Sequence, residues 1–318
     1  MILVTGATGF VGRALTDLLV ERGCSVRAAM RRAGAFTAAG ASVVTVGDLS
    51  AQTDWSAALA GVEAVVHAAA RVHVMQEAAA DPLVEFRRIN VQGTLQLARR
   101  AAAEGVRRFV FISSVKVNGE ATRPGHPFTA DDAPAPLDAY GISKMEAEQG
   151  LREIAAQTGM EVVIIRPPLV YGPGVKANFQ SMMRWLTRGV PLPLGAIHNH
   201  RSLVALDNLV DLIVTCVDHP AAANQTFLIS DGEDLSTTQL LQRMGQALGK
   251  PARLIPVPTG LLTLGAALIG KPAVAQRLCG SLQVDISKTR QLLGWSAPVS
   301  VDEGLKKAAE GYWREASV

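Results

Sequence analysis

The sequence predicts an α/β protein in which a doubly wound parallel sheet carries a smaller, mixed α/β second lobe. Three observations predict this fold class. Short β-branched runs alternate with long amphipathic ones over the first half of the chain, a glycine-rich turn joins the first run to the first helix, and this rhythm stops after Arg166. Alternation of this kind is typical of parallel sheets whose crossover connections are right-handed.

Six short apolar runs have the composition of buried parallel strands, which are covered on both faces and therefore show little alternation of polar and apolar residues. They span residues 2–5, 25–29, 43–46, 64–67, 109–113 and 162–166. Amphipathic helical patterns lie between them at 10–22, 85–104 and 140–158. Gly23, Gly105 and Gly159 directly follow these helical patterns, and glycine readily adopts the left-handed conformation that ends helices.

After Arg166 the chain is rich in proline, and helices no longer pair cleanly with strands. We therefore expect residues 1–170 to form the first domain, completed by a returning segment at about 203–217, and residues 171–318 to form a discontinuous second lobe. The most apolar stretch, 257–269, is too short to span a bilayer, which takes about 20 residues. We interpret it as a buried helix of the second lobe.

Composition limits the classes of function. The net charge of +3 is a mild excess, and pairs such as Arg87-Arg88 fit solvated helix faces better than a nucleic-acid-binding stripe. The three cysteines are far apart and odd in number, which predicts that the protein is located in the reducing cytoplasm and has no disulfide framework. The first strand begins directly after Met1, so we expect no leader sequence and no membrane span.

A glycine-rich turn joins the first predicted strand to the first predicted helix. Gly6, Gly9 and Gly12 have the spacing GxxGxxG, and a residue without a Cβ lets the backbone approach a pyrophosphate closely. The free N–H groups at the start of the following helix also favour a phosphate. We therefore predict a dinucleotide site built on Gly6, Thr8, Gly9, Phe10, Val11 and Gly12.

Further motifs follow the later strands: Asp48-Leu49, His67-Ala68-Ala69-Ala70, Asn90, Ser113-Ser114, and the pair Tyr140 and Lys144. Together with the glycine turn they resemble the extended short-chain dehydrogenase/reductase superfamily, and within it the UDP-glucose 4-epimerase-like (NAD-dependent epimerase/dehydratase) family, over essentially the whole chain. The resemblance implies a Rossmann-type fold. It also implies cofactor contacts at Asp48, Leu49, Ala68, Ala69, Ala70, Lys144 and Pro167.

One departure from the family concerns the cofactor. Members that prefer NAD usually end the second strand with an acidic residue, whereas this chain has Met30-Arg31-Arg32. Arginine suits a 2′-phosphate because its planar fork pairs with phosphate oxygens. We therefore expect Arg31 and Arg32 to contact the cofactor and favour NADP(H), with NAD(H) as the alternative.

Tyr140 and Lys144 are four residues apart, so a helix places both on one face. A free tyrosine has a pKa of roughly 10, and an adjacent ammonium is expected to lower the pKa of the phenol towards neutrality. In the family this tyrosine exchanges a proton with the substrate. The resemblance implies that Ser114 completes a catalytic triad and that Asn90 supports it.

The resemblance also bears on the substrate. Related dehydratases carry an Asp-Glu pair after the catalytic hydroxyl residue, and Val115 and Lys116 stand there instead, which disfavours dehydration. Lys116 and Asn118 either meet the substrate or are solvated loop residues. Family analogy adds substrate contacts at Asn178, Arg201 and Arg277. His198 and His200 lack nearby carboxylate or cysteine partners in the sequence, so we predict no metal.

Three functions are open. The first two are enzyme activities with a UDP-sugar as the implied partner, and the family implies a homodimer. The first is NAD(P)H-dependent reduction of a UDP-4-keto-6-deoxy-hexose in surface-polysaccharide synthesis, because Val117 to Glu120 resemble a motif of the reductases that form UDP-N-acetylquinovosamine. The second is 4-epimerisation of UDP-glucose or UDP-N-acetylglucosamine. The third, a non-catalytic dinucleotide-binding scaffold, is disfavoured because the tyrosine–lysine pair is present.

Overall fold

The computed structural model describes residues 1–32, 34, 40–72, 81–268 and 270–316. Its lower lobe contains a seven-stranded sheet in the order β3-β2-β1-β4-β5-β6-β9, with every neighbouring pair parallel. The strands are β1 (Ile2–Thr5), β2 (Val26–Met30), β3 (Ser42–Thr45), β4 (Ala64–His67), β5 (Arg108–Ile112), β6 (Glu161–Arg166) and β9 (Thr226–Leu228). The predicted doubly wound α/β class is confirmed.

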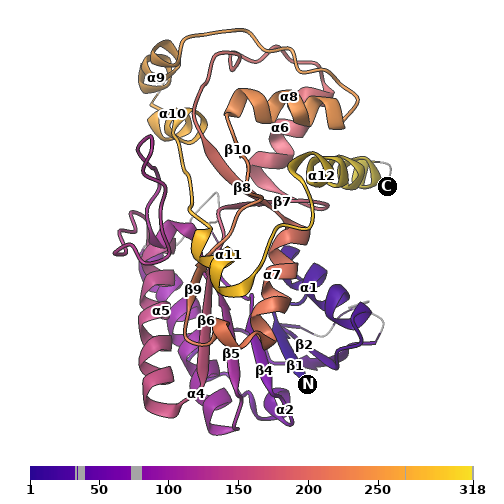
Figure 1. Cartoon of the computed structure of the whole chain (residues 1–318), viewed down its shortest axis with the longest axis vertical. Coiled ribbons are helices and arrows are strands. Elements are labelled where there is room, and N and C mark those ends of the chain that lie inside the picture. The colour runs from indigo at the N-terminus through magenta and orange to yellow at the C-terminus, as the bar shows by residue number, and fades with distance from the viewer. Residues whose placement is uncertain (33, 35–39, 73–80, 269, 317–318) are drawn as a thin grey trace.

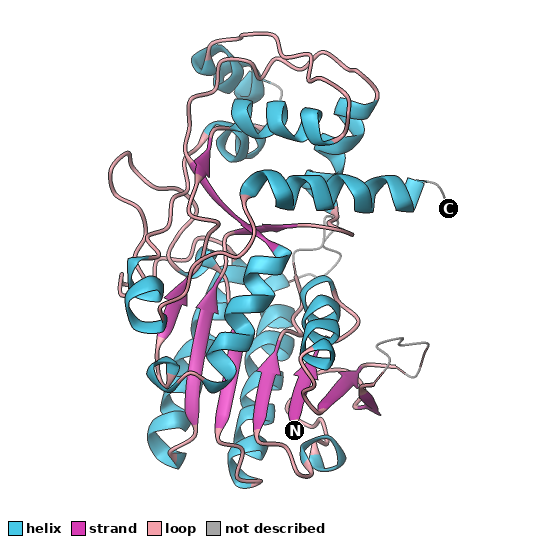
Figure 2. Cartoon of the chain, turned by 45° about the vertical axis from the view of Figure 1, so that its right-hand side comes forward, coloured by secondary structure: helices cyan, strands magenta, loops and turns pink. Residues whose placement is uncertain are grey.

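Helices cover both faces of this sheet (Figure 2). One face packs against α1 (Phe10–Glu21) and α7 (Leu206–Asp218), whose leucines join a core with the strands. The other face packs against α4 (Thr94–Ala103) and α5 (Ala139–Thr158). Since α7 comes from the second half of the chain, the lower lobe is built from distant segments. The division near residue 170 stays a prediction.

The upper lobe is smaller and holds a three-stranded mixed sheet in the order β10-β8-β7 (Figure 1). The strands are β7 (Leu169–Tyr171), β8 (Arg201–Ala205) and β10 (Asp234–Leu235). A second core joins this sheet to α6 (Ala177–Thr187), α8 (Thr237–Ala247) and α12 (Val301–Ala316). The remaining elements are α2 (Ser56–Leu59), η2 (Val115–Val117), η3 (Pro220–Ala222), α9 (Thr259–Leu268), α10 (Pro272–Cys279) and α11 (Ser287–Leu293).

Each of the six strands predicted from the sequence is present, within one residue at either end. The predicted helix over 85–104 is interrupted. It consists of α3 (Pro82–Phe86), a π-helical segment η1 (Arg87–Gly93) and α4. A π segment widens the helix locally and is common near functional sites.

The interpretation of 257–269 as a buried helix is wrong for the part that the structure describes. None of the residues of α9 is buried. The sequence pattern could not separate the two cases because an all-apolar run has no polar face to mark the solvent side. Among the described residues, no helix has both the length and the hydrophobicity needed to cross a membrane.

Candidate active site

The glycine turn forms a tight loop between β1 and α1. Gly6 has a φ of +68°, and its carbonyl accepts a hydrogen bond of 2.8 Å from the Gly9 N–H. A Cβ added at Gly12 would lie 2.1 Å from the Gly6 oxygen, and one at Gly6 would lie 2.8 Å from Ala69. The first turn of α1 is also free of a side-chain cap, because its N-cap residue is Gly9. These features fit the pyrophosphate of a dinucleotide, which needs close backbone approach and unoccupied N–H groups.

The other predicted cofactor residues surround the same edge of the sheet. Ala68, Ala69 and Ala70 follow β4, and the Ala69 N–H donates to the Thr5 hydroxyl at the end of β1. Leu49 approaches the backbone of Gly93 in η1. Pro167 is buried after β6, and its carbonyl accepts from the Val115 N–H. The carboxyl ends of β1, β4 and β6 therefore meet at one crevice, where ligands of open α/β sheets bind.

Arg31 and Arg32 follow β2 and are exposed. The Arg31 Nε lies 3.7 Å from a carboxylate oxygen of Asp48, and both side chains are largely solvent-accessible. This ion pair is weak because water screens it. It nevertheless puts a negative charge beside the guanidinium group that was expected to bind a 2′-phosphate.

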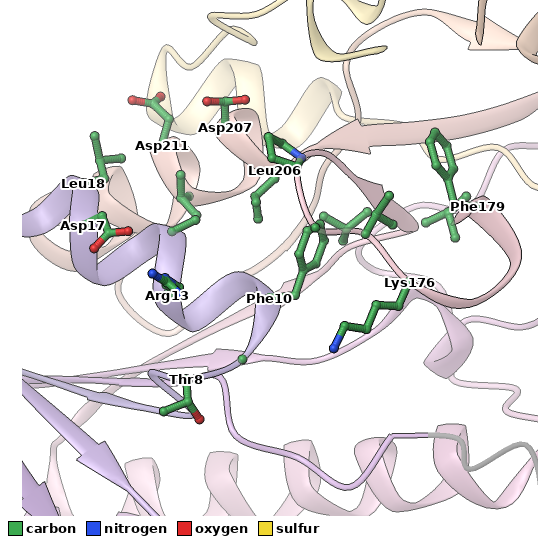
Figure 3. A pocket seen from close by; sticks show the side chains of 18 of the residues that line it. Thr8, Phe10, Arg13, Asp17, Leu18, Lys176, Phe179, Leu206, Asp207 and Asp211 are labelled. Carbon is green, nitrogen blue, oxygen red and sulfur yellow. The ribbon is translucent and has the colours of Figure 1, made fainter. Parts of the chain in front are cut away.

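A cavity of about 1190 Å³ runs along α1 and α7, from the end of the glycine loop to the segment that follows β7. Figure 3 shows Thr8 and Phe10 on one side of it and Lys176 and Phe179 on the other. Asn178, a predicted substrate residue, also lines it. Lys176 was not predicted from the sequence, because a lone lysine after Gly174 carries no motif. It provides a cation opposite the helix N-terminus that we expect to hold phosphate.

Ser114, Tyr140 and Lys144 do not line this cavity and are brought together where the end of β5 meets the start of α5. The Ser114 hydroxyl hydrogen-bonds the Tyr140 phenol. The Lys144 Nζ donates to the Ile112 carbonyl at 2.8 Å and lies 5.9 Å from the centre of the Tyr140 ring. Asp138 caps α5 and so fixes its first turn, on which Tyr140 lies. The two side chains thus face the same side of the helix, as the spacing predicted.

The electrostatics of this pair differ from our expectation. Burial raises the pKa of Tyr140 to about 12, with a further contribution from the Asp138 carboxylate that outweighs the hydrogen bond from Ser114. Burial also lowers the pKa of Lys144 to about 7. The expected lowering of the phenol pKa is therefore wrong for the protein in this state. The physical reason is that both groups lose water, so Lys144 is only partly charged near neutrality.

A buried ionic network lies beneath the triad. Glu148 follows Lys144 by one turn of α5, is fully buried, and accepts two hydrogen bonds from the Arg166 guanidinium and one from the Ser113 hydroxyl. Arg166 also donates to the Asn118 amide at 3.0 Å. This network was not predicted from the sequence. The signal that could have identified it is a glutamate one turn after Lys144, on the helix that directly precedes the strand ending in Arg166.

Two more polar residues anchor the cofactor edge. His67 is fully buried between the hydroxyls of Thr5 and Thr94, at 2.7 and 2.9 Å, and burial lowers its pKa to about 3. Asn90 in η1 accepts from the Arg71 N–H, and its amide nitrogen contacts the Arg71 carbonyl and the Ser143 hydroxyl. Asn90 thus ties the segment after β4 to α5, an arrangement that suits the predicted supporting role.

Residues 2–230 match the family model described as the NAD dependent epimerase/dehydratase family. The chain belongs to this family. It is 50% identical, over 98% of its length and 95% of the relative's, to a UDP-glucose 4-epimerase of Vibrio cholerae. It is 28% identical, over 97% and 94% of the two lengths, to the N-acetyl-alpha-D-glucosaminyl-diphospho-ditrans,octacis-undecaprenol 4-epimerase of Escherichia coli O157:H7. A solved structure of MoeE5 with UDP-glucose and NAD superposes with a TM-score of 0.78 at 26% identity, over 100% of this chain and 99% of that one.

The predicted substrate residues of this family member have different surroundings. Lys116 is partly exposed and forms ion pairs with Asp138 and Glu120. Asn118 is buried, and its amide nitrogen donates to the Thr129 carbonyl while its oxygen accepts from Arg166. Both ends of the Asn118 amide are therefore engaged within the protein, which favours a structural role over the predicted substrate contact.

Arg201 and Arg277 meet at the carboxyl end of α10. The Arg201 guanidinium donates to the carbonyl oxygens of Arg277 and Gly280 at 2.9 and 3.1 Å, and burial lowers the pKa of Arg201. The Arg277 side chain is exposed. The two predicted contacts are thus neighbours in space, and they lie on the upper lobe.

His198 and His200 are exposed, on either side of a buried Asn199. Asn199 bonds the Leu278 and Gly280 carbonyls and so stabilises the loop. Within the described residues, no group of three or more histidine, cysteine, aspartate or glutamate side chains is placed to hold a metal ion.

Proposed function

We propose that this protein is a UDP-hexose 4-epimerase that works with tightly held NAD(H). The observation that carries the proposal is the meeting of Ser114, Tyr140 and Lys144 beside a glycine loop that fits a pyrophosphate. The 50% identity to the UDP-glucose 4-epimerase of Vibrio cholerae supports this reaction over reduction of a 4-keto sugar.

The chain's own residues perform the proton transfers of this reaction. Tyr140 accepts the proton of the sugar 4-hydroxyl as the ketone forms and returns it when the hydroxyl is rebuilt on the opposite face. Ser114, which hydrogen-bonds the Tyr140 phenol in the structure, would bond the same sugar oxygen, and a charged Lys144 would stabilise the phenolate from nearby. The dinucleotide, when bound, supplies the hydride acceptor and then the hydride donor at C4.

Cationic side chains of the upper lobe hold the substrate diphosphate in this proposal. Among the described residues, the partners of the Arg201 guanidinium are carbonyl groups, so an arriving diphosphate would be its first anionic partner. Lys116, Asn178, Lys176 and Arg277 are further candidates around the approach to the site. Charge-assisted hydrogen bonds to phosphate oxygens are about twice as strong as neutral ones.

NAD(H) is favoured over NADP(H) for two reasons. The relative MoeE5 was solved with NAD, and Asp48 lies beside Arg31, where its carboxylate repels a 2′-phosphate. Reduction of a UDP-4-keto-6-deoxy-hexose with NADPH is the second candidate, and the exposed Arg31 and Arg32 are the observation that favours it. We keep the expectations of a homodimer and of a cytoplasmic location, the latter in line with three free cysteines.

The test offers the purified protein UDP-glucose and UDP-N-acetylglucosamine with catalytic NAD⁺, and separately UDP-4-keto-6-deoxy-N-acetylglucosamine with NADPH. Formation of the 4-epimer without net change in absorbance at the nicotinamide band supports the epimerase. Stoichiometric consumption of NADPH with the keto sugar alone refutes it in favour of the reductase.

Tyr140→Phe provides the control for catalysis. The substitution removes the hydroxyl and keeps the ring, so we expect turnover to fall by about 10²- to 10⁴-fold while dinucleotide binding is retained. Equal turnover by the two proteins would contradict the assigned role of Tyr140, and absence of turnover in both would favour the non-catalytic scaffold. Light scattering of the same samples tests the homodimer.

A further inference from the structure

The helix pair α9 and α10 forms the outer end of the upper lobe (Figure 1). Leu261, Leu264 and Leu268 are 60%, 58% and 80% exposed. Their spacing of three and four residues places them on one face of α9. Leu262, on the other side, packs partly against the upper core. One side of α9 thus attaches the helix to the protein while a leucine stripe faces outward.

Two further exposed apolar side chains lie on the segments that flank α9. Val274 of α10 is 48% exposed, and Ile255, in the segment that leads into α9, is 50% exposed. The ten residues of α9 include no charged side chain. Several large apolar side chains gathered at one end of a molecule mark an interaction surface, whereas a single exposed one needs no explanation.

The part of the chain that contains α9 and α10 has only basic charged residues. Between Asp234 and Asp285 the chain has no acidic residue and five basic ones. Without those five, the net charge of the chain changes from +3 to −2. Arg243 is paired with Glu233 and Asp302. The other four are exposed and, within the described residues, have no ion-pair partner: Lys250, Arg253, Lys271 and Arg277.

We propose that the outer face of α9 and α10 binds the surface of an anionic phospholipid bilayer. Leu261, Leu264 and Leu268 insert at the level of the headgroups, and the basic side chains of the pair, Lys271 between the two helices and Arg277 on α10, contact lipid phosphates. Exposed leucines together with unpaired lysines and arginines are the combination that binds such a surface without crossing it. Each basic side chain close to an anionic membrane adds attraction that depends on the salt concentration.

A second copy of the chain fits this face less well. A two-fold contact would bring the same basic residues of both copies together, with no acidic residue of the segment to neutralise them. Like charges in a contact of this kind oppose association. An anionic bilayer satisfies both the leucine stripe and the basic side chains.

Bilayer binding would also affect access to the site. The carbonyls of Arg277 and Gly280, at the end of α10, hold the Arg201 guanidinium. The membrane-binding element is thus in direct contact with the residue to which we assign the substrate diphosphate. This last consequence rests on the proposed function, whereas the binding of lipid does not.

The test is cosedimentation of the full chain with vesicles of phosphatidylcholine alone and of an equimolar mixture with phosphatidylglycerol. We expect binding to the mixed vesicles that weakens as salt is raised. The triple variant Leu261→Gln, Leu264→Gln and Leu268→Gln should bind at least about tenfold more weakly. Lys271→Glu should weaken binding by about fivefold or more. The matched control is Val43→Gln with Val84→Gln, two exposed apolar residues of the lower lobe that should not affect binding.

Thermal unfolding and UDP-sugar turnover of each variant, measured without vesicles, show whether it is folded. Failure of the wild type to bind either vesicle, or binding of the triple variant at the wild-type level, would overturn the proposal. A wild-type oligomer that becomes monomeric only in the triple variant would assign the face to a second copy instead. Loss of turnover in all proteins with vesicle binding intact would count against the proposed function alone.

Discussion

Substitution of Gly12 by alanine tests the dinucleotide site most directly. The new Cβ would lie 2.1 Å from the Gly6 oxygen and 2.7 Å from its carbonyl carbon. Ordinary contacts begin at 3.4 Å, so the shortfall is about 1.3 Å in a densely packed region. The atoms it meets belong to the backbone and cannot rotate away, so the loop itself has to move.

The cost of this substitution follows from its geometry. Overpacking a well-packed region costs about 1–3 kcal/mol, and a backbone clash of this size belongs at the upper end of that range. Moving the Gly6–Gly9 turn also turns the N–H groups of α1 away from the pyrophosphate. If about 3 kcal/mol is lost from binding, the affinity for the dinucleotide falls at least about hundredfold.

The measurements are isothermal titration calorimetry with NAD⁺ and chemical unfolding without ligand. Gly265→Ala is the matched control, because its Cβ meets nothing within 4 Å. In a helix this change should be neutral or stabilise by up to about 1 kcal/mol. Wild-type affinity and stability in Gly12→Ala would refute the packing argument and remove the main support for the dinucleotide site.

Three further predictions concern charge. Glu148→Gln should destabilise by about 3–5 kcal/mol in a urea titration, because it leaves the Arg166 guanidinium buried and unpaired. Glu85→Gln, in an exposed pair, is the control and should leave the urea midpoint unchanged. His67 has a pKa near 6.5 in the unfolded chain and about 3 in the folded one. Its protonation in the unfolded chain therefore lowers the free energy of unfolding as the pH falls between those values, by about 2 kcal/mol at pH 5. The free energy of unfolding of His67→Gln should fall less steeply with acid, and the same pH dependence in both proteins would contradict this. Arg31→Ala should leave the affinity for NAD⁺ within about threefold, because the ion pair of Arg31 is exposed. If the wild type binds NADP⁺ more tightly than NAD⁺ and this preference disappears in the variant, the cofactor assignment is reversed.

The sheet and the position of the triad could be predicted from the sequence because each depends on local pattern. The strand β4, for example, has three apolar residues followed by the buried His67, and it starts and ends where predicted. The spacing of Tyr140 and Lys144 requires only that α5 be a helix, and their shared face follows from its geometry. The glycine loop likewise follows from a short contiguous motif.

The remaining features depend on contacts between distant segments. Glu148, Arg166 and Asn118 are separated by up to 48 residues along the chain, yet their side chains form one network. The exposure of α9 depends on whether a neighbouring helix covers it, which its own residues do not indicate. The pKa of Tyr140 depends on the depth of burial and on Asp138, neither of which the four-residue spacing reveals.

The pKa values of the triad bear on which reaction it can perform. With the pKa of Tyr140 at about 12 and that of Lys144 at about 7, the phenol keeps its proton near neutrality and the amine is only partly charged. A protonated phenol is ready to donate to a ketone, which is the reducing half of the proposed reaction. The oxidising half needs a phenolate, and a nearby positive charge favours that form. An oxidised nicotinamide carries such a charge and a reduced one does not. The charge beside Tyr140 would therefore differ between the two half-reactions. In the proposed epimerisation Tyr140 passes through both forms in each turnover, so the pocket has to accommodate the phenol and the phenolate in turn.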